Sequence, residues 1–377
     1  MGNSNKQLVS INLFITNVNL VKDNGQTPFH LAKKLGMKGT IVCYKNGEYP
    51  FVKNISPWIS LEYLVPSKFI IYSARFSVVK YIIKNYKKID ILMSYGFSKE
   101  SMVYCFIYKT LRPEGKTYIK CDCNMGILER AILKNPIKRG LQKYLYNSVD
   151  LFSVESRQVK NTLLKIYPKI FSKKIEYLPN GISKEDLKFP VDIKNKEKTI
   201  LFVGKVGDQV KAWDILIKAF KEIDSASWTL LLAGPLTLDY SSLENIVGNI
   251  PQNVKIVGNI ENRNELYHYY SKSAIFCLPS LSESFGIAML EAAVFGCYLV
   301  VSDLPSTQDI TDGGRLGDLV IPGDLKSLKQ ALTKVMDPNF LQERETKSKE
   351  LMSYARKNFI WEDLITRVSD RMGVNNS

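Results

Sequence analysis

Two acidic residues enclose a segment of small and apolar side chains in the stretch "LSESFGIAMLEAAVFG", which covers residues 281–296. Glu283 is expected in the turn before a helix, and Glu291 on the helix itself. A carboxylate is poorly suited to phosphate but accepts hydrogen bonds from hydroxyl groups, so Glu283 suits a sugar and Glu291 the two hydroxyls of a ribose. Gly286 would let the backbone approach a ligand, and the free N–H groups at the helix start favour an anion such as a diphosphate.

Two lysines occur in a second cluster, "LFVGKVGDQVKAWDILIKAF", which covers residues 201–220. The pattern predicts a strand that ends at Val203, a turn opened by Gly204 and a helix after Lys211. Lys205 and Lys211 flank this loop. Two cations there would neutralise the charge that builds on a departing nucleoside diphosphate, so the sequence predicts no metal held by carboxylates.

The composition is that of a globular protein with two domains. The chain has 377 residues, of which 45% are hydrophobic and 24% charged, and a single hydrophobic core rarely grows to this size. No run of 18 apolar residues occurs, and the start "MGNSNKQ" has no features of a signal peptide. We therefore expect a cytoplasmic protein.

The positive charge is concentrated in the first half of the chain. Residues 1–190 hold 31 Lys and Arg against 13 Asp and Glu, a net +18, while the rest of the chain is slightly acidic. Such an asymmetry favours an anionic partner: nucleic acid, a membrane surface or a phosphorylated substrate. A bias toward lysine in the solvated faces would give the same numbers.

The cysteines and histidines predict no metal site. The six cysteines are scattered, and neither His30 nor His268 lies at ligand spacing from one of them. We expect reduced thiols in the core. His30 is expected to be a surface or capping residue.

Strand and helix patterns alternate along the whole chain. The first half predicts strands at 8–16, 38–44, 68–73, 89–95, 117–123, 150–156 and 174–179, and helices at 28–36 and 129–149. The alternation restarts at 198–206, after a polar stretch at 189–198, and continues to 303. This pattern is typical of two doubly wound α/β halves with parallel sheets, whose ligands lie at the carboxyl ends of the strands.

Four blocks resemble the retaining glycosyltransferases of family 4, which have the GT-B fold. They are the E-x7-E segment "ESFGIAMLE", the lysine block "LFVGKVGDQVKAWDILIKAF", "LPNG" and "VSDLPSTQDITDGGRLGDLVIPGD". Their order and spacing agree over residues 175–330. The resemblance implies two Rossmann-like doubly wound domains, 1–188 and 189–354, that face a central cleft. It also implies a final helix, within 355–377, that packs back on the first domain.

The resemblance also implies roles for single residues. Glu283 would contact the donor sugar, Glu291 the ribose, and Lys205 and Lys211 the diphosphate. Gly25 matches a loop glycine that lets the backbone approach the phosphates, although the family's second glycine is absent. The remaining donor-binding residues would act mainly through their backbone: Asn259, Ile260, Ser284, Phe285, Gly286 and Ile287.

Asp122 departs from the family pattern, because a histidine often follows the corresponding strand. A carboxylate here would hydrogen-bond a donor hydroxyl or lie beneath the developing oxocarbenium charge. We therefore treat Asp122, with Glu283, as a candidate catalytic residue.

The implied activity is transfer of a hexose from a nucleotide-sugar to an acceptor hydroxyl with retention of configuration, without a cofactor. We expect a UDP-sugar as donor, with a GDP-sugar as the alternative. The acceptor would be a saccharide or a lipid-linked precursor at the inner face of an anionic membrane. The alternatives are a nucleic-acid-binding protein that uses the basic half, for which no reading motif is found, and a GT-B nucleotide-sugar epimerase.

Overall fold

The computed structural model describes residues 6–65, 73–123, 125–131, 136–225 and 227–374. They form two compact units. One consists of Met1–Gly181 with Trp361–Ser377, and the other of Ile182–Ile360. The chain thus passes between the units at 181/182 and 360/361, where the sequence predicted 188/189 and 354/355.

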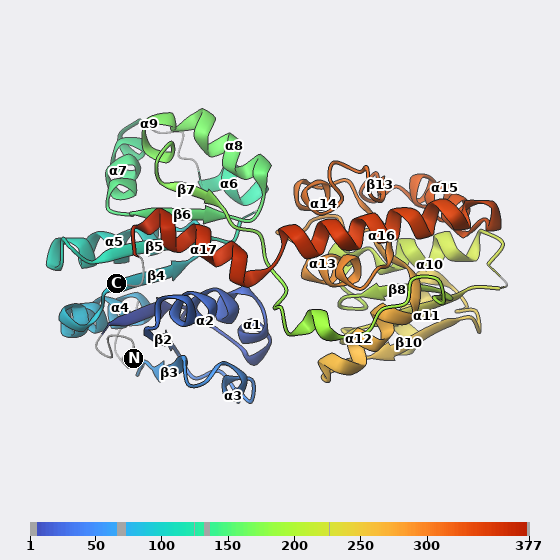
Figure 1. Ribbon diagram of the computed structural model, residues 1–377, viewed down its shortest axis with the longest axis horizontal. Helices are drawn as coiled ribbons and strands as arrows, with labels where there is room; N and C mark the ends of the chain where they lie inside the picture. The colour runs from blue at the N-terminus through green and yellow to red at the C-terminus, as the bar shows by residue number, and fades with distance from the viewer. Residues whose placement is uncertain (1–5, 66–72, 124, 132–135, 226, 375–377) are drawn as a thin grey trace. The chain divides into compact units, whose positions relative to one another are not determined.

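The amino-terminal unit is built on a seven-stranded sheet with the order β3-β2-β1-β4-β5-β6-β7 (Figure 1). All its strand pairs are parallel; Leu8, for example, lies opposite Gly39 on one side and Ile91 on the other. Its inner strands are almost fully buried, as expected for a sheet covered by helices on both faces. The strands are β1 (Gln7–Ile11), β2 (Lys38–Cys43), β3 (Ile59–Tyr63), β4 (Ile91–Tyr95), β5 (Lys116–Cys121), β6 (Leu151–Val154) and β7 (Ile175–Tyr177).

The helices of this unit begin earlier than the sequence predicted. The segment 17–27, expected to be a loop, contains α1 and the first turn of α2, because the Thr16 side chain caps α1 in a capping box with Asn19. The predicted helix 129–149 consists of α6 and α7. The helices are α1 (Asn17–Val21), α2 (Asp23–Leu35), α3 (Val52–Ile55), α4 (Ser73–Asn85), η1 (Tyr86–Lys88), α5 (Lys99–Leu111), α6 (Met125–Ala131), α7 (Pro136–Asn147), α8 (Arg157–Ile166), α9 (Pro168–Phe171) and α17 (Trp361–Met372).

The edge of the sheet was not predicted correctly. The outer strand β3 has the sequence "ISLEY", with only Ile59 buried, so neither a buried run nor a helix period marks it. The strand predicted at 68–73 lies outside the described residues, apart from Ser73, which begins α4.

The carboxyl-terminal unit has a six-stranded parallel sheet with the order β10-β9-β8-β11-β12-β13 (Figure 1). Both sheets therefore have the doubly wound topology that the sequence predicted. The strands are β8 (Glu197–Val203), β9 (Thr229–Ala233), β10 (Val254–Gly258), β11 (Ser273–Leu278), β12 (Tyr298–Ser302) and β13 (Asp318–Val320). The helices are η2 (Asp186–Lys188), η3 (Gln209–Lys211), α10 (Trp213–Lys221), α11 (Tyr240–Val247), α12 (Arg263–Lys272), α13 (Ile287–Val294), α14 (Pro305–Ile310), α15 (Leu325–Met336), η4 (Pro338–Phe340) and α16 (Leu341–Asn358).

The last helix, α17, returns to the amino-terminal unit and packs on α2. There the ring of His30 stacks on Trp361, with 5.6 Å between the ring centroids. The prediction of a surface histidine is wrong, since His30 is 3% exposed. Burial, with a smaller effect from nearby Lys33, lowers the pKa of His30 to about 3, so its imidazole is neutral.

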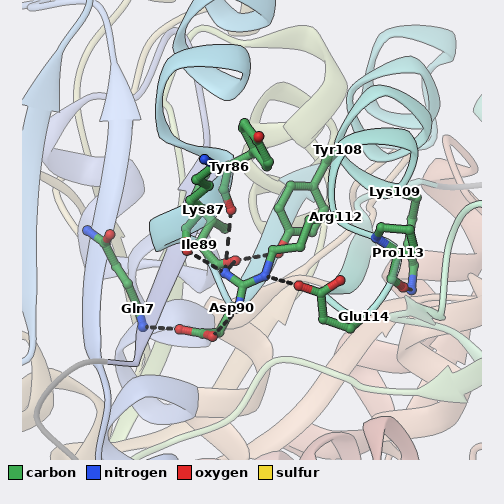
Figure 2. A network of polar contacts seen from close by, with 10 residues as sticks. All are labelled: Gln7, Tyr86, Lys87, Ile89, Asp90, Tyr108, Lys109, Arg112, Pro113 and Glu114. Carbon is green, nitrogen blue, oxygen red and sulfur yellow. Dashed lines mark hydrogen bonds and ion pairs between the residues drawn. The ribbon is translucent and has the colours of Figure 1, made fainter.

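Figure 2 shows a polar network around Arg112 in the amino-terminal unit. Its guanidinium donates to Asp90 Oδ1 at 2.8 Å, to Glu114 Oε1 at 3.0 Å and to main-chain carbonyls that include that of Lys87 at 2.9 Å. The other carboxylate oxygen of Asp90, Oδ2, accepts a hydrogen bond from the main-chain N–H of Gln7 at 2.8 Å. Asp90 and Gln7 lie at the start of β4 and β1. The network therefore joins the amino ends of these strands, away from the edge where ligands of such sheets bind.

We expect Arg112→Gln to destabilise the chain by about 2 kcal/mol, because charge-assisted hydrogen bonds to half-buried groups are lost together. Urea unfolding of the parent and the variant measures the difference. Arg75→Gln is a matched control, since Arg75 pairs with Glu100 on the surface with 57% of its side chain exposed, and such pairs contribute at most about 1 kcal/mol. Equal losses in the two variants would contradict a structural role for the network.

Candidate active site

The predicted lysine and glutamate clusters meet where the strand order of the carboxyl-terminal sheet reverses. β8 pairs with β9 on one side and with β11 on the other. The loops that leave β8 and β11 therefore begin side by side at the carboxyl edge, the position where open α/β sheets bind ligands. Lys205 and Lys211 belong to the first loop, and Glu283 to the second.

An ion pair and a main-chain hydrogen bond join these two loops. Lys211 Nζ lies 2.7 Å from Glu283 Oε1, which also accepts from Ser280 Oγ at 2.8 Å. Close by, the amide of Leu281 donates to the carbonyl of Val210 at 2.8 Å. The side chains of Lys211 and Glu283 are 25% and 9% exposed. The pair is thus held in place while the ammonium keeps access to solvent.

The turn into α13 requires Gly286. Its φ of 84° lies in the left-handed region, and a Cβ atom there would lie 2.0 Å from Met289 Cε. Among the described residues no side chain caps α13. The Met289 amide donates to the Gly286 carbonyl at 3.0 Å, which leaves the amides of Ile287 and Ala288 without a carbonyl partner within the helix. Phe285, just before the glycine, is buried in the core, whereas Ser284 is half-buried. These two amides begin the helix four residues after Glu283.

Glu291 is held by two residues that the sequence analysis did not single out. Its side chain is 5% exposed; Oε1 accepts from Arg263 Nη2 at 2.8 Å and Oε2 from the Tyr270 hydroxyl at 3.0 Å. Burial and the negative charge of Glu291 raise the pKa of Tyr270 well above its ordinary value, so the phenol keeps its proton. Both partners belong to α12, whose aromatic-rich sequence indicated only a helix.

The other predicted donor-binding residues of this unit lie at the same edge. Lys205 is exposed and follows Gly204, directly after β8. Asn259 is exposed and Ile260 half-buried in the segment between β10 and α12. No hydrogen bond or ion pair among the described residues joins these three to Glu283 or Glu291. Arg263, four residues after Asn259, makes the contact to Glu291.

Gly25 and Asp122 belong to the amino-terminal unit. Gly25 lies in the first turn of α2 rather than in the predicted loop, and a Cβ there would lie 2.1 Å from the Leu20 carbonyl oxygen. Close packing of its own chain is therefore a sufficient reason for this glycine. Asp122 is exposed and follows the end of β5. A part for either residue in the donor site stays a prediction.

A buried cluster of charges, Asp23, Lys120 and Glu155, lies next to Asp122. Lys120 Nζ is 2.7 Å from Glu155 Oε1 and 3.6 Å from Asp23 Oδ2, and none of the three side chains is more than 8% exposed. Burial raises the pKa of both carboxyl groups against the effect of Lys120. The negative charge of Asp122 adds to the rise in both, and that of Asp23 adds to the rise in Glu155, whereas a hydrogen bond with Glu155 lowers the pKa of Asp23. Burial alone would lower the pKa of Lys120, but the two acids raise it overall. Two acids thus share one permanent cation.

The cysteines are free and buried, as predicted. Burial raises the pKa of both neighbouring thiols, Cys121 and Cys123. Within the described residues, no group of three or more His, Cys, Asp or Glu side chains could hold a metal ion.

Part of the chain matches a known protein family. Residues 197–337 match the family described as "Glycosyl transferases group 1", and this range contains the Lys211–Glu283 pair and the Glu291–Arg263 pair. Over these residues the carboxyl-terminal unit is similar to the group 1 glycosyl transferases. The predicted resemblance to this family is therefore confirmed.

Two curated proteins that resemble this unit are named as mannosyltransferases. A phosphatidyl-myo-inositol mannosyltransferase of Mycobacterium leprae is 27% identical over 44% of this chain and 46% of its own. The O-antigen chain mannosyltransferase RfbU of Salmonella typhimurium is 30% identical over 48% of this chain and 49% of its own. The aligned part thus spans about half the length of the relatives.

The similarity of fold extends beyond residues 197–337. The structure of Anabaena HepE in complex with UDP and glucose matches with a TM-score of 0.71 at 12% identity, over 98% of this chain and 99% of that chain. At this identity the likeness shows the fold alone. It confirms the predicted GT-B fold for the two Rossmann-like sheets.

The charge cluster predicts a stability that falls as the pH rises. The folded-state pKa of Glu155 is about 8, above the ordinary value of 4.5. Between these values the folded chain therefore holds a proton that the unfolded chain has released. Stability should be greatest at the acidic end of this window and should be lost progressively toward pH 8. Glu155→Gln, which cannot ionise, should flatten this dependence.

Urea midpoints of the parent and Glu155→Gln at pH 5, 6.5 and 8 test the cluster. Glu48→Gln is the control, because Glu48 is 86% exposed in a surface pair with Lys45. A Glu155→Gln variant whose midpoint falls with pH as steeply as that of the parent would show that the acids titrate normally.

Proposed function

We propose that the protein is a retaining glycosyltransferase that transfers a hexose from a nucleotide-sugar to an acceptor hydroxyl. The observation that carries the proposal is the contact between Lys211 and Glu283 at the carboxyl edge of the second sheet, with the start of α13 four residues after Glu283. The cations and amides suit a diphosphate, and the carboxylate suits the hydroxyls of the attached sugar. The mannosyltransferase names of the two relatives support a hexose.

The resemblance to the family supports the following reaction. The bond between the anomeric carbon and the diphosphate oxygen breaks, while Lys205, Lys211 and the helix amides stabilise the charge on the departing diphosphate. The acceptor oxygen bonds to the same face of the anomeric carbon, and its proton passes to the departing diphosphate oxygen. Glu283 would orient the sugar. In this scheme the lysines and amides stabilise the leaving group without a metal ion.

We propose a UDP-sugar as donor and a GDP-sugar as the alternative. The UDP and glucose of the HepE complex support the former, although they belong to that protein. The roles of Asn259 and Ile260 at the base, of Gly25 at the phosphates and of Asp122 near the sugar are parts of the same proposal.

Binding of nucleoside diphosphates tests the donor site directly. We expect one of UDP, GDP, ADP and CDP to raise the melting temperature of the full chain, since a ligand at 100 times its Kd stabilises by about 2.7 kcal/mol. Lys211→Gln should weaken that binding about tenfold or more, because it removes a charge-assisted contact. Lys218→Gln is the matched control, since Lys218 pairs with Asp214 within α10. This variant should bind the nucleoside diphosphate as the parent does. Salt-dependent binding of duplex DNA without binding of any diphosphate would favour the nucleic-acid alternative.

We further propose that the acceptor is a lipid-linked or polysaccharide precursor at the inner face of a membrane. The net +18 of residues 1–190 supports attraction to anionic lipids, and the name of the Mycobacterium leprae relative includes a phosphoinositide. Among the helices that the structure describes, none combines the length and apolarity needed to cross a bilayer. The proposed association is therefore peripheral and electrostatic.

Sedimentation with lipid vesicles measures this association. At low salt the chain should pellet with vesicles that contain anionic lipid and stay in the supernatant with neutral ones. Raising the salt to 0.5 M should release it, because the Debye length then falls below about 5 Å. Equal sedimentation with both kinds of vesicle would favour an acceptor free in solution.

A further inference from the structure

The first residue of α12, Arg263, is held by contacts to two residues, Glu291 and Tyr267. Its Nη2 atom donates to Glu291 Oε1 at 2.8 Å, and its Nε atom donates to the Tyr267 hydroxyl at 2.8 Å. The guanidinium also lies over the ring of Tyr267, 4.9 Å from the centroid. Tyr267 packs in turn on Phe295, with ring centroids 4.6 Å apart. A long, flexible side chain is thereby held in a single orientation.

Glu291 is oriented by protein groups but is not saturated by them. Each carboxylate oxygen receives one described hydrogen bond, from Arg263 or from Tyr270. Because each oxygen of a carboxylate can accept two hydrogen bonds, one acceptor position remains on each. Glu291 therefore keeps hydrogen-bond acceptor capacity that Arg263 and Tyr270 do not use.

Arg263 has unused donor capacity beside those positions. A guanidinium has five N–H groups, and Nη1 has no hydrogen-bond partner among the described residues. The side chain is 35% exposed, against 5% for Glu291. Arg263 therefore places a cationic donor at the solvent side of the carboxylate.

We propose that Arg263 is a further donor-binding residue, whose Nη1 atom donates to a hydroxyl oxygen of the nucleotide ribose while Glu291 accepts from the ribose hydroxyls. The inference rests on the proposed function. It adds a fifth binding residue to the site that the two glutamates and two lysines define. The chemistry is complementary, because a vicinal diol offers both O–H donors and oxygen acceptors. A carboxylate alone can only accept hydrogen bonds from the O–H groups. A carboxylate paired with a guanidinium can also donate hydrogen bonds to the hydroxyl oxygens.

A purely structural Arg263 would have a different signature. If Arg263 only held Glu291 in place, its loss would misplace the carboxylate without any direct contact to the ligand being lost. Deoxy-nucleotides distinguish the two roles, because removing the hydroxyl that Arg263 contacts removes the interaction from the ligand side. The effects of the substitution and of the missing hydroxyl should then be strongly non-additive.

The experiment measures the Kd values of UDP, 2′-deoxy-UDP and 3′-deoxy-UDP for the parent and for Arg263→Gln by calorimetry. If the parent prefers GDP, the corresponding guanine compounds replace them. We expect Arg263→Gln to weaken binding of the ribonucleotide about tenfold, and binding of one deoxy-nucleotide by no more than about threefold. The tenfold effect corresponds to about 1.4 kcal/mol, the size of one hydrogen bond to a charged group. An equal loss for all three ligands would overturn the proposal.

Two further variants keep the test decisive. Arg263→Lys preserves the positive charge beside Glu291 but lacks the planar guanidinium group. It should therefore show the same non-additivity as Arg263→Gln. It replaces Arg263→Gln if that variant does not fold. Arg315→Gln removes an arginine that forms ion pairs on the surface with Asp312 and Glu350, and it should bind all three ligands as the parent does.

The failure of this inference is distinct from that of the proposed function. A parent chain that binds none of the nucleotides contradicts the nucleotide site as a whole. A parent that binds the ribonucleotide, with equal losses for every ligand in Arg263→Gln, contradicts only the contact between Arg263 and the ribose.

Discussion

The site depends on one pairing of opposite charges across two loops. Lys211 and Glu283 are 72 residues apart in sequence, yet they lie 2.7 Å apart because β8 and β11 are neighbours at the point where the strand order reverses. The hydrogen bond between Leu281 and Val210 fixes the same two loops through their main chain. The cation and the carboxylate that would contact a diphosphate and its sugar are therefore positioned before any ligand arrives, which lowers the cost of ordering them on binding.

A second pairing holds the other glutamate between two helices. Glu291 of α13 is bound by Arg263 and Tyr270 of α12, and Lys196 anchors the carboxyl end of α12 by donating to the carbonyls of Tyr270 and Ser273. Burial lowers the pKa of Lys196 against the influence of Cys297. Helix α12 therefore has a fixed carboxyl end and a first residue that contacts the site. These contacts orient the nearly buried carboxylate of Glu291 while each of its oxygens accepts only one described hydrogen bond.

The sequence predicted the parts of the fold and site that depend on local patterns. The alternation of buried strands with helices identified both doubly wound sheets, and the motif around Gly286 identified a turn whose positive φ and tight contact to Met289 the structure explains. Strand β3 could not be found, because four of its five residues are not buried. Arg263 and Tyr270 could not be found either, since their importance comes from contacts to a residue more than 20 positions away. His30 was misjudged for a similar reason: only tertiary packing on Trp361 makes it a core residue.

A crystal structure of the chain soaked with UDP tests the central claim most directly. The account predicts that the diphosphate lies within hydrogen-bonding distance of the amides at the start of α13 and of Lys205 or Lys211, with the ribose hydroxyls on Glu291. A nucleotide bound elsewhere on the chain, or a site that stays empty at a saturating concentration of both UDP and GDP, would contradict it.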